Sequence, residues 1–156
     1  MRIAITGSSG LIGSALSRRL TTLDHTVVPV VRRPGRDGEI SWSPSDSTID
    51  PHAFDGLDAV VHLAGAGIGD KRWTDDYKRE LLDSRTKGTQ LVVDAITSAE
   101  NGPKVLLSGS AIGYYGARGD EELDESSLAG DGFLADLCVQ WEELAAPAVD
   151  VGTRVA

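Results

Sequence analysis

Three glycines near the start of the chain have the spacing and the setting of a phosphate-binding turn. They stand three residues apart in the segment TGSSGLIG, residues 6–13. The apolar run before this segment predicts a buried strand, and residues 14–20 after it predict a helix. Between a strand and a helix, such glycines allow a tight turn and close approach of a pyrophosphate to the backbone, beside free N–H groups of the helix. The residues expected to hold a dinucleotide here are Gly7, Ser9, Gly10, Leu11, Ile12 and Gly13, and the alternative is an ordinary turn between strand and helix.

Two arginines follow the next predicted strand, residues 26–31. Arg32 and Arg33 stand where an acidic residue would accept the ribose 2′-hydroxyl of NAD. Guanidinium groups suit a 2′-phosphate instead, because they bind phosphate oxygens through charge-assisted hydrogen bonds. The arginines therefore favour NADP(H) as the cofactor, and the alternative is a pair of solvated side chains at the start of a loop.

Small and hydroxylated residues end two further predicted strands. The apolar run 58–65 ends in a segment small enough for a cofactor to lie flat across its backbone. The run 104–108 leads into a loop with two serines, where a hydroxyl could face a nicotinamide ring or a substrate carbonyl. These candidates are Leu63, Ala64, Gly65 and Ser108 for the cofactor, and Ser110 for the substrate oxygen.

Strands and helices alternate along the whole chain, which predicts a doubly wound parallel sheet of the Rossmann type, an α/β fold. Ligands of such sheets bind at the carboxyl ends of the strands, where all the candidates above lie. The expected order of the first five strands is 3-2-1-4-5, in one NAD(P)-binding domain that spans residues 1–156. The expected strands are 1–5, 26–31, 39–42, 58–65 and 104–108, with another beginning in 151–156, and the expected helices are 14–20, 73–100 and 133–146.

Composition limits the functions to consider. The formal net charge of −9 argues against nonspecific binding to nucleic acid or to an anionic membrane. The single cysteine excludes an internal disulfide framework, and the acidic residues have no metal-site spacing. His62 lies in a predicted buried strand, so a satisfied core histidine is expected there rather than a base. With no signal peptide and no apolar run long enough for a membrane span, we expect a cytoplasmic protein.

The segments DAVVHLAG and VLLSGSAIGYYG, with the glycine motif, resemble the extended short-chain dehydrogenase/reductase superfamily. The closer resemblance is to its atypical "epimerase family" proteins, often labelled nucleoside-diphosphate-sugar epimerase-like. That resemblance implies hydride transfer with a nicotinamide cofactor and a small-molecule substrate such as a nucleotide sugar. It also implies a substrate-binding part after the nucleotide domain, so we expect this chain to be truncated before that part. The segments that carry the closer resemblance are Lys71–Thr74, Ser84–Arg85, Ser110–Gly116, Phe133–Ala135 and Trp141–Glu142.

The chain departs from the superfamily at the residues that move the proton. The superfamily uses a serine, which maps to Ser110, and a tyrosine with a lysine four residues later. The tyrosine position holds Phe133 or Leu134, and the lysine position holds Leu137 or Cys138. Tyr114 or Tyr115, with Lys78 or Arg85, could form a substitute pair; the preferred alternative is that the tyrosines pack the loop and Arg85 holds a phosphate.

Two functions follow from these residues. The first is an NADP(H)-binding oxidoreductase or sugar-nucleotide epimerase that acts by hydride transfer, with Ser110 orienting the oxygen and Tyr114 and Tyr115 as further catalytic candidates. The second is a catalytically silent module that senses a dinucleotide or binds a partner. For the second, the edge of the sheet could be completed by another chain, or the protein could form a homodimer.

Overall fold

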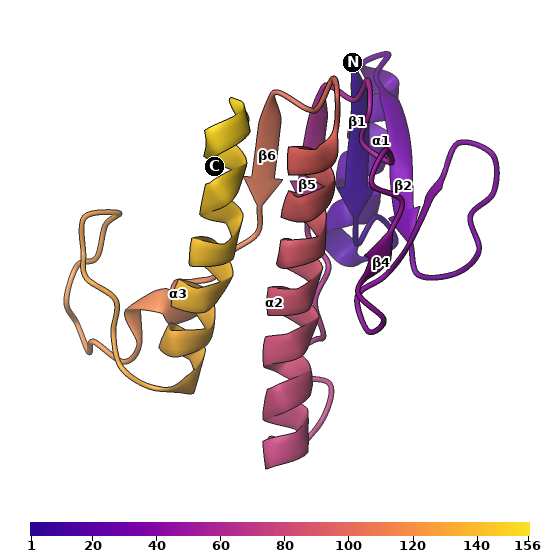
Figure 1. Ribbon diagram of the computed structural model, residues 1–156. Helices are drawn as coiled ribbons and strands as arrows, with labels where there is room; N and C mark the ends of the chain where they lie inside the picture. The colour runs from indigo at the N-terminus through magenta and orange to yellow at the C-terminus, as the bar shows by residue number, and fades with distance from the viewer.

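The structure, a computed structural model, describes all residues from Met1 to Ala156. Seven strands form one sheet with the order β4-β3-β2-β1-β5-β6-β7. Helices α2 and α3 lie side by side over one face of this sheet, and α1 lies on the other face (Figure 1). The elements are β1 (Arg2–Thr6), α1 (Leu11–Thr22), β2 (Thr26–Val31), β3 (Ile40–Ser43), β4 (Thr48–Ile49), β5 (Ala59–His62), α2 (Asp75–Ser98), β6 (Val105–Ser108), η1 (Ile112–Tyr115), α3 (Phe133–Ala145), η2 (Ala146–Val151) and β7 (Arg154–Val155).

The predicted Rossmann-type sheet is confirmed, including the order of its first five strands. Adjacent strands from β3 to β7 are parallel, and β7 pairs with β6 as the expected further strand. The exception is β4, which pairs antiparallel with β3 through Trp42 opposite Ile49. This strand is not among those expected from the sequence, because two strand residues among serines and aspartates are too few to show an alternating pattern.

Pro29 lies inside β2, opposite Ile5 of β1. Proline cannot donate a ladder hydrogen bond, so within a sheet it is confined to a bulge or an edge. Strand β3 pairs with β2 only at Val30 and Val31. The part of β2 that contains Pro29 therefore has a neighbouring strand on one side only, which is an edge position.

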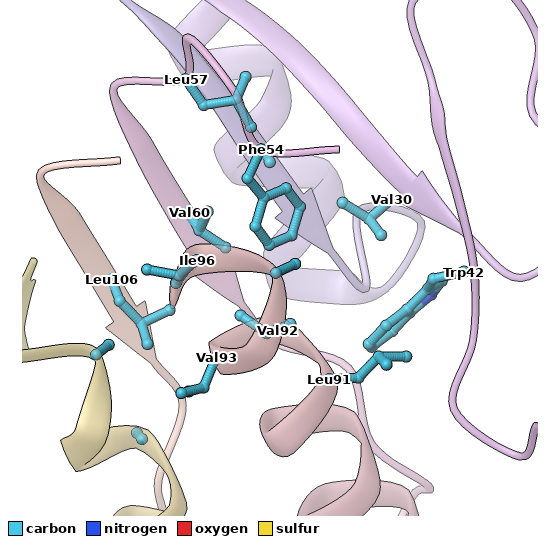
Figure 2. Packing of buried hydrophobic residues seen from close by; sticks show 14 of the residues in the cluster. Val30, Trp42, Phe54, Leu57, Val60, Leu91, Val92, Val93, Ile96 and Leu106 are labelled. Carbon is cyan, nitrogen blue, oxygen red and sulfur yellow. The ribbon is translucent and has the colours of Figure 1, made fainter. Parts of the chain in front are cut away.

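The main core lies between the sheet and α2. Figure 2 shows Val92, Val93 and Ile96 of α2 facing Val60 of β5 and Leu106 of β6. A small residue on this helix face also allows close packing: a Cβ atom on Gly88 would lie 3.5 Å from the His62 ring and 3.6 Å from the Trp42 ring. The indole and the imidazole therefore pack directly on the helix backbone, and they meet edge to face at 6.0 Å.

The opposite face of the sheet packs on α1. Ile3, Ile5 and Val61 form a smaller buried cluster there, against which Leu16 and Leu20 of the helix pack. The two helical layers thus hold the parallel strands in place, and the candidate residues were expected at the carboxyl ends of these strands.

No helix in the structure has both the length and the apolar character that a membrane span requires.

Candidate functional site

A cavity of about 1410 Å³ opens at the carboxyl ends of β1, β2 and β5. It brings together residues that are far apart in the sequence but were expected to bind one cofactor. Those that line it are Gly7, Ser9, Gly10, Arg32, Arg33, Leu63, Ala64 and Gly65. The remaining predicted site residues, which do not line it, are Leu11, Ile12, Gly13, Arg85, Ser108, Ser110, Tyr114 and Tyr115.

The glycine turn is built so that side chains cannot enter it. Gly7 has a φ of +68°, and a Cβ atom there would lie 3.0 Å from the carbonyl of Leu63. A Cβ atom on Gly13 would lie 2.2 Å from the Gly7 oxygen, so the helix could not approach the turn as it does. Gly10 begins α1 in an extended conformation and caps it without a side chain. The first N–H groups of α1 therefore have no side-chain acceptor and remain available to an anion.

Leu11 and Ile12 contribute to this turn through the backbone alone. They are the first residues of α1, and their side chains are 90% and 67% exposed. The helix also begins three residues earlier than the sequence pattern indicated, because the last part of the glycine motif is itself helical. A ligand at the turn would meet the N–H groups of these residues rather than their side chains.

The two arginines after β2 differ in their partners. Both nitrogens at the end of the Arg33 guanidinium donate to the Glu39 carboxylate, each at 2.7 Å. Glu39 also accepts a hydrogen bond from the backbone N–H of Arg36 at 2.9 Å. The Arg33 guanidinium, with the Arg36 N–H, lowers the pKa of Glu39 to about 2. Arg32 is exposed and belongs to none of the protein's ion pairs.

A buried hydrogen-bond network joins the ends of β1 and β5 beneath the cavity. The hydroxyl oxygen of Thr6 accepts hydrogen bonds from the N–H groups of Leu63 and Ala64, at 3.0 and 3.1 Å. Its own proton is then donated to Nδ1 of His62, 2.7 Å away. The imidazole therefore carries its proton on Nε2, which donates to the Thr89 hydroxyl at 3.2 Å. Burial lowers the pKa of His62 to about 4, so this histidine is the satisfied, neutral core residue that was expected.

Three side chains of α2 hold the loop that follows β5. Ser84 accepts a hydrogen bond from the Ala66 N–H at 3.0 Å, and Arg85 donates to the Ala66 carbonyl at 3.1 Å. The Tyr77 hydroxyl donates to the carbonyl of Gly67. Both polar groups of the Ala66 backbone are therefore bonded to the helix, which positions the loop as one wall of the cavity.

Arg85 does not point into the cavity as expected. Its residue is only 8% exposed, and its guanidinium stacks on the Trp141 ring at 5.1 Å from the ring centre. Its terminal nitrogen donates to the carbonyls of Leu81 and Ala66. Burial lowers the pKa of this guanidinium from its ordinary value. The Arg85 guanidinium therefore lies between the loop after β5 and the Trp141 ring of α3, and it does not line the cavity.

The serines after β6 lie outside the cavity. The Ser108 hydroxyl is buried and has no hydrogen-bond partner. Ser110 is exposed, and its hydroxyl donates to the carboxylate of Glu142 on α3. Tyr114 and Tyr115 pack edge to face on each other at 5.2 Å, and Tyr114 packs against the apolar cluster beneath α3. The packing of the loop by these tyrosines is the alternative preferred from the sequence.

An apolar cluster occupies the place where the superfamily has its tyrosine and lysine. Leu137 and Cys138 are each 2% exposed and pack with Trp141 between α2 and α3. Burial raises the pKa of the Cys138 thiol, so a thiolate is disfavoured there. Lys78, one candidate for a substitute pair, lies over the Phe133 ring at 5.7 Å and forms no hydrogen bond with either tyrosine of η1. The structure thus contains no tyrosine–lysine pair at these positions.

The sequence analysis missed the polar face that α2 turns to the cavity. Its members recur every three or four residues, which is the signal that could have revealed them. Glu39 and Trp42 were also missed, because their positions depend on how the loop after β2 returns to β3. The cavity-lining residues not predicted on α2 are Tyr77, Glu80, Asp83, Ser84 and Lys87.

Comparison with known proteins supplies independent evidence about the family and the fold. The profile of the NAD dependent epimerase/dehydratase family matches residues 3–131. An epimerase family protein of Mycobacterium bovis is 47% identical over 154 residues, which are 98% of this chain and 50% of that protein. This chain therefore spans about half the length of the curated relatives it matches.

Solved structures agree. A nucleoside-diphosphate sugar epimerase from Corynebacterium glutamicum has a TM-score of 0.87 at 38% identity, over 99% of this chain and 32% of that one. The human epimerase family protein SDR39U1, crystallised with NADPH, has a TM-score of 0.82 at 34% identity, over 99% of this chain and 52% of that one. Both structures are thus longer chains that contain the fold described above.

Proposed function

The chain belongs to the NAD dependent epimerase/dehydratase family, and from that premise we propose that it binds NADP(H) in the cavity at the carboxyl ends of β1, β2 and β5. The observation that carries the proposal is the glycine turn, where Cβ atoms on Gly7 and Gly13 would collide with backbone and where α1 begins without a side-chain cap. Such a turn accepts a pyrophosphate against its N–H groups.

The choice of NADP(H) over NAD(H) rests on the end of β2. Arg32 lines the cavity and has no carboxylate partner, so its charge is available to a 2′-phosphate. The human relative SDR39U1 was crystallised with NADPH, which supports the same choice. The remaining predicted contacts, Leu63, Ala64 and Gly65, would lie along the nucleotide as the floor of the cavity.

We infer that the reaction, where one occurs, is hydride transfer to or from a carbon that bears oxygen. Bound NADP(H) supplies or accepts the hydride at its nicotinamide ring. Ser110 is the residue of this chain proposed to orient the substrate oxygen. Because its hydroxyl proton is donated to Glu142, its oxygen would accept a hydrogen bond from a substrate hydroxyl, and donation to a substrate carbonyl would require the hydroxyl to turn away from Glu142. A nucleotide sugar is the proposed substrate class, because the similar Corynebacterium glutamicum structure is named a nucleoside-diphosphate sugar epimerase.

A second candidate function is a dinucleotide-binding module without catalysis. The observation in its favour is the apolar cluster of Leu137, Cys138 and Trp141, which leaves no tyrosine–lysine pair to move a proton. A tyrosine needs a nearby cation to act as a base at neutral pH, since its ordinary pKa is about 10. Both candidates require the same cofactor site, so binding is tested first.

Isothermal titration of NADPH and NADH into the protein tests the binding site. We expect NADPH to bind and the Gly10→Val variant to lose binding, because a side chain there crowds the Gly7 oxygen, 3.3 Å from the Cβ position. Gly69→Val is the matched control, since the space around that glycine is open. The proposal would be overturned if neither NADPH nor NADH gave a binding signal with the wild type, or if Gly10→Val bound NADPH as tightly as the wild type.

Hydride-transfer assays then separate the two candidates. With small carbonyl compounds the readout is NADPH consumption. With nucleotide sugars and NADP+ it is the epimerised sugar, separated by chromatography, because an epimerase returns the hydride and consumes no cofactor. Turnover on either readout that falls at least about 100-fold in Ser110→Ala would support the enzyme. Binding of NADPH without turnover on any substrate of either class would favour the silent module.

A further inference from the structure

The guanidinium of Arg33 already holds an anion that belongs to the chain itself. Its two terminal nitrogens donate to the two oxygens of Glu39, each at 2.7 Å, in the two-point, end-on geometry that an arginine also uses for phosphate. One of these nitrogens also donates to the Pro34 carbonyl at 3.0 Å. The donors that Arg33 would offer to a nucleotide are therefore largely occupied.

The pair lies inside the cofactor cavity. Arg32, Arg33 and Glu39 all line the cavity, at the end of β2 and the start of β3. The Glu39 side chain is only 16% exposed, while that of Arg33 is 47% exposed. Glu39 is also anchored by the Arg36 N–H, so the carboxylate is held by the loop and is not free to turn away.

Only one of the two guanidinium groups at this end of the cavity lacks a carboxylate partner. Two guanidinium groups and one carboxylate leave one net positive charge, and the unpaired cation is Arg32. A 2′-phosphate would meet Arg32 as its direct partner and would compete with Glu39 for Arg33. We propose that Glu39 is a specificity-determining residue: by occupying the guanidinium of Arg33, it reduces the preference for NADP(H), which carries the 2′-phosphate, over NAD(H). This inference rests on the NADP(H) site proposed above.

This role predicts that removing the carboxylate partner of Arg33 strengthens the binding of NADPH. Glu39→Gln removes one negative charge beside the phosphate and frees Arg33, while the amide oxygen still accepts from the Arg36 N–H. NADH carries no phosphate at the 2′ position, so the same change leaves its affinity unaltered. The ratio of the two affinities therefore isolates the effect of Glu39 from any general change in the site.

The test is titration of NADPH, NADH, 2′,5′-ADP and 5′-AMP into the wild type and three variants. Glu39→Gln is expected to bind NADPH and 2′,5′-ADP about tenfold more tightly, with NADH and 5′-AMP within about twofold of the wild type. The double variant Arg33→Ala/Glu39→Gln keeps Arg32 alone and restores one net positive charge. It is therefore expected to bind NADPH within about threefold of the wild type.

Glu121→Gln is the matched control. Arg118 also binds Glu121 at two points, through Nε and one terminal nitrogen at 2.8 Å each, but neither residue lines the cavity. This control is expected to leave all four affinities unchanged.

The outcomes separate this inference from the function on which it rests. If the wild type binds NADPH and Glu39→Gln leaves the ratio of NADPH to NADH affinity unchanged or lowers it, Glu39 does not set specificity, although the cofactor site stands. A loss of NADPH binding of more than about tenfold in the double variant would show Arg33 to be the phosphate ligand and would also overturn the inference. If the wild type binds none of the four ligands, both the cofactor site and the role of Glu39 fall.

Discussion

The Thr6 hydroxyl donates its proton to Nδ1 of His62 across 2.7 Å, and this bond sets the chemistry of the histidine. Because the Thr6 oxygen already accepts from two N–H groups of the β5 end, its proton has only one acceptor left, and the imidazole must be the neutral Nε2–H tautomer. A protonated imidazole would place a proton on Nδ1 and break this arrangement. The network under the cavity at the ends of β1, β2 and β5 therefore exists in one protonation state.

The first prediction concerns pH. The folded-state pKa of His62 is about 4, below the ordinary 6.5, because of burial. Above pH 6.5 the imidazole is neutral in both states, so its contribution to stability is fully present. As the pH falls from 6.5 to 4 only the unfolded chain takes up the proton, and the free energy of unfolding falls by about 3 kcal/mol from this residue. Urea unfolding of the wild type at a series of pH values measures the fall.

His62→Gln provides the comparison for that measurement. The variant is expected to be less stable at neutral pH but to lose less stability between pH 6.5 and 4, because glutamine does not titrate. All other titrating groups are shared, so the difference between the two curves belongs to His62. Parallel curves over this range would show that the imidazole is not held neutral by the fold.

A second prediction tests the Thr6 hydroxyl as the link between two strand ends. Thr6→Val preserves the shape but leaves the Ala64 N–H and His62 Nδ1 without their partner, while the Leu63 N–H keeps only the carbonyl of residue 6 at 3.3 Å. This loss is expected to lower the unfolding free energy by about 2–4 kcal/mol. The same change loosens the cavity floor, so NADPH affinity is expected to fall as well. Thermal unfolding and titration calorimetry measure the two effects.

Thr6→Ser is the control for that variant. The serine hydroxyl can make the same three hydrogen bonds, so it is expected to recover most of the stability and the NADPH affinity that valine loses. Equal behaviour of the serine and valine variants would show that packing of the methyl group, and not the hydroxyl, matters at this position.

The sequence predicted those parts of the fold that depend on local patterns. Continuous apolar runs indicated the strands, and a repeat of three or four residues indicated α2. The alternation of strands and helices predicted a parallel sheet, and the Rossmann-type fold gave the expected strand order. The sequence analysis predicted no strand after β3, because β4 has only two residues, Thr48 and Ile49. Pattern-based reasoning works where many residues of one element share one environment.

The candidate site was less predictable, because its details depend on contacts between distant residues. The cavity-lining glycines and arginines were identified from motif and position, but nothing local indicated that Glu39 would bind Arg33. Arg85 was expected in the cleft, since a helix face alone does not reveal that Trp141 from α3 covers its guanidinium. The partner of each charged side chain was thus the least accessible feature.

A third prediction concerns packing of α1 on the glycine turn. Gly13→Ala places a methyl group 2.2 Å from the Gly7 oxygen, which is backbone and cannot move without displacing the turn. Overpacking of this kind is expected to cost about 2–4 kcal/mol, more than the roughly 1 kcal/mol that alanine gains in helix propensity. Gly69→Ala, where nothing lies near the added atom, is expected to change stability by less than about 0.5 kcal/mol. Chemical unfolding of both variants decides the point, and equal stabilities would contradict the close approach.

The last prediction concerns the free arginine at the end of β2. Arg32→Ala removes the unpaired cation of the cavity and leaves Arg33 neutralised by Glu39, so NADPH affinity is expected to fall by at least about tenfold while NADH affinity stays within about twofold. The salt dependence of NADPH binding is expected to weaken in the same variant, because the lost contact is ionic. Arg18→Ala, an arginine on α1 that does not line the cavity, serves as the control of equal charge change. Equal losses of NADPH and NADH affinity in Arg32→Ala would place the arginine elsewhere on the nucleotide and remove the basis for preferring the phosphorylated cofactor.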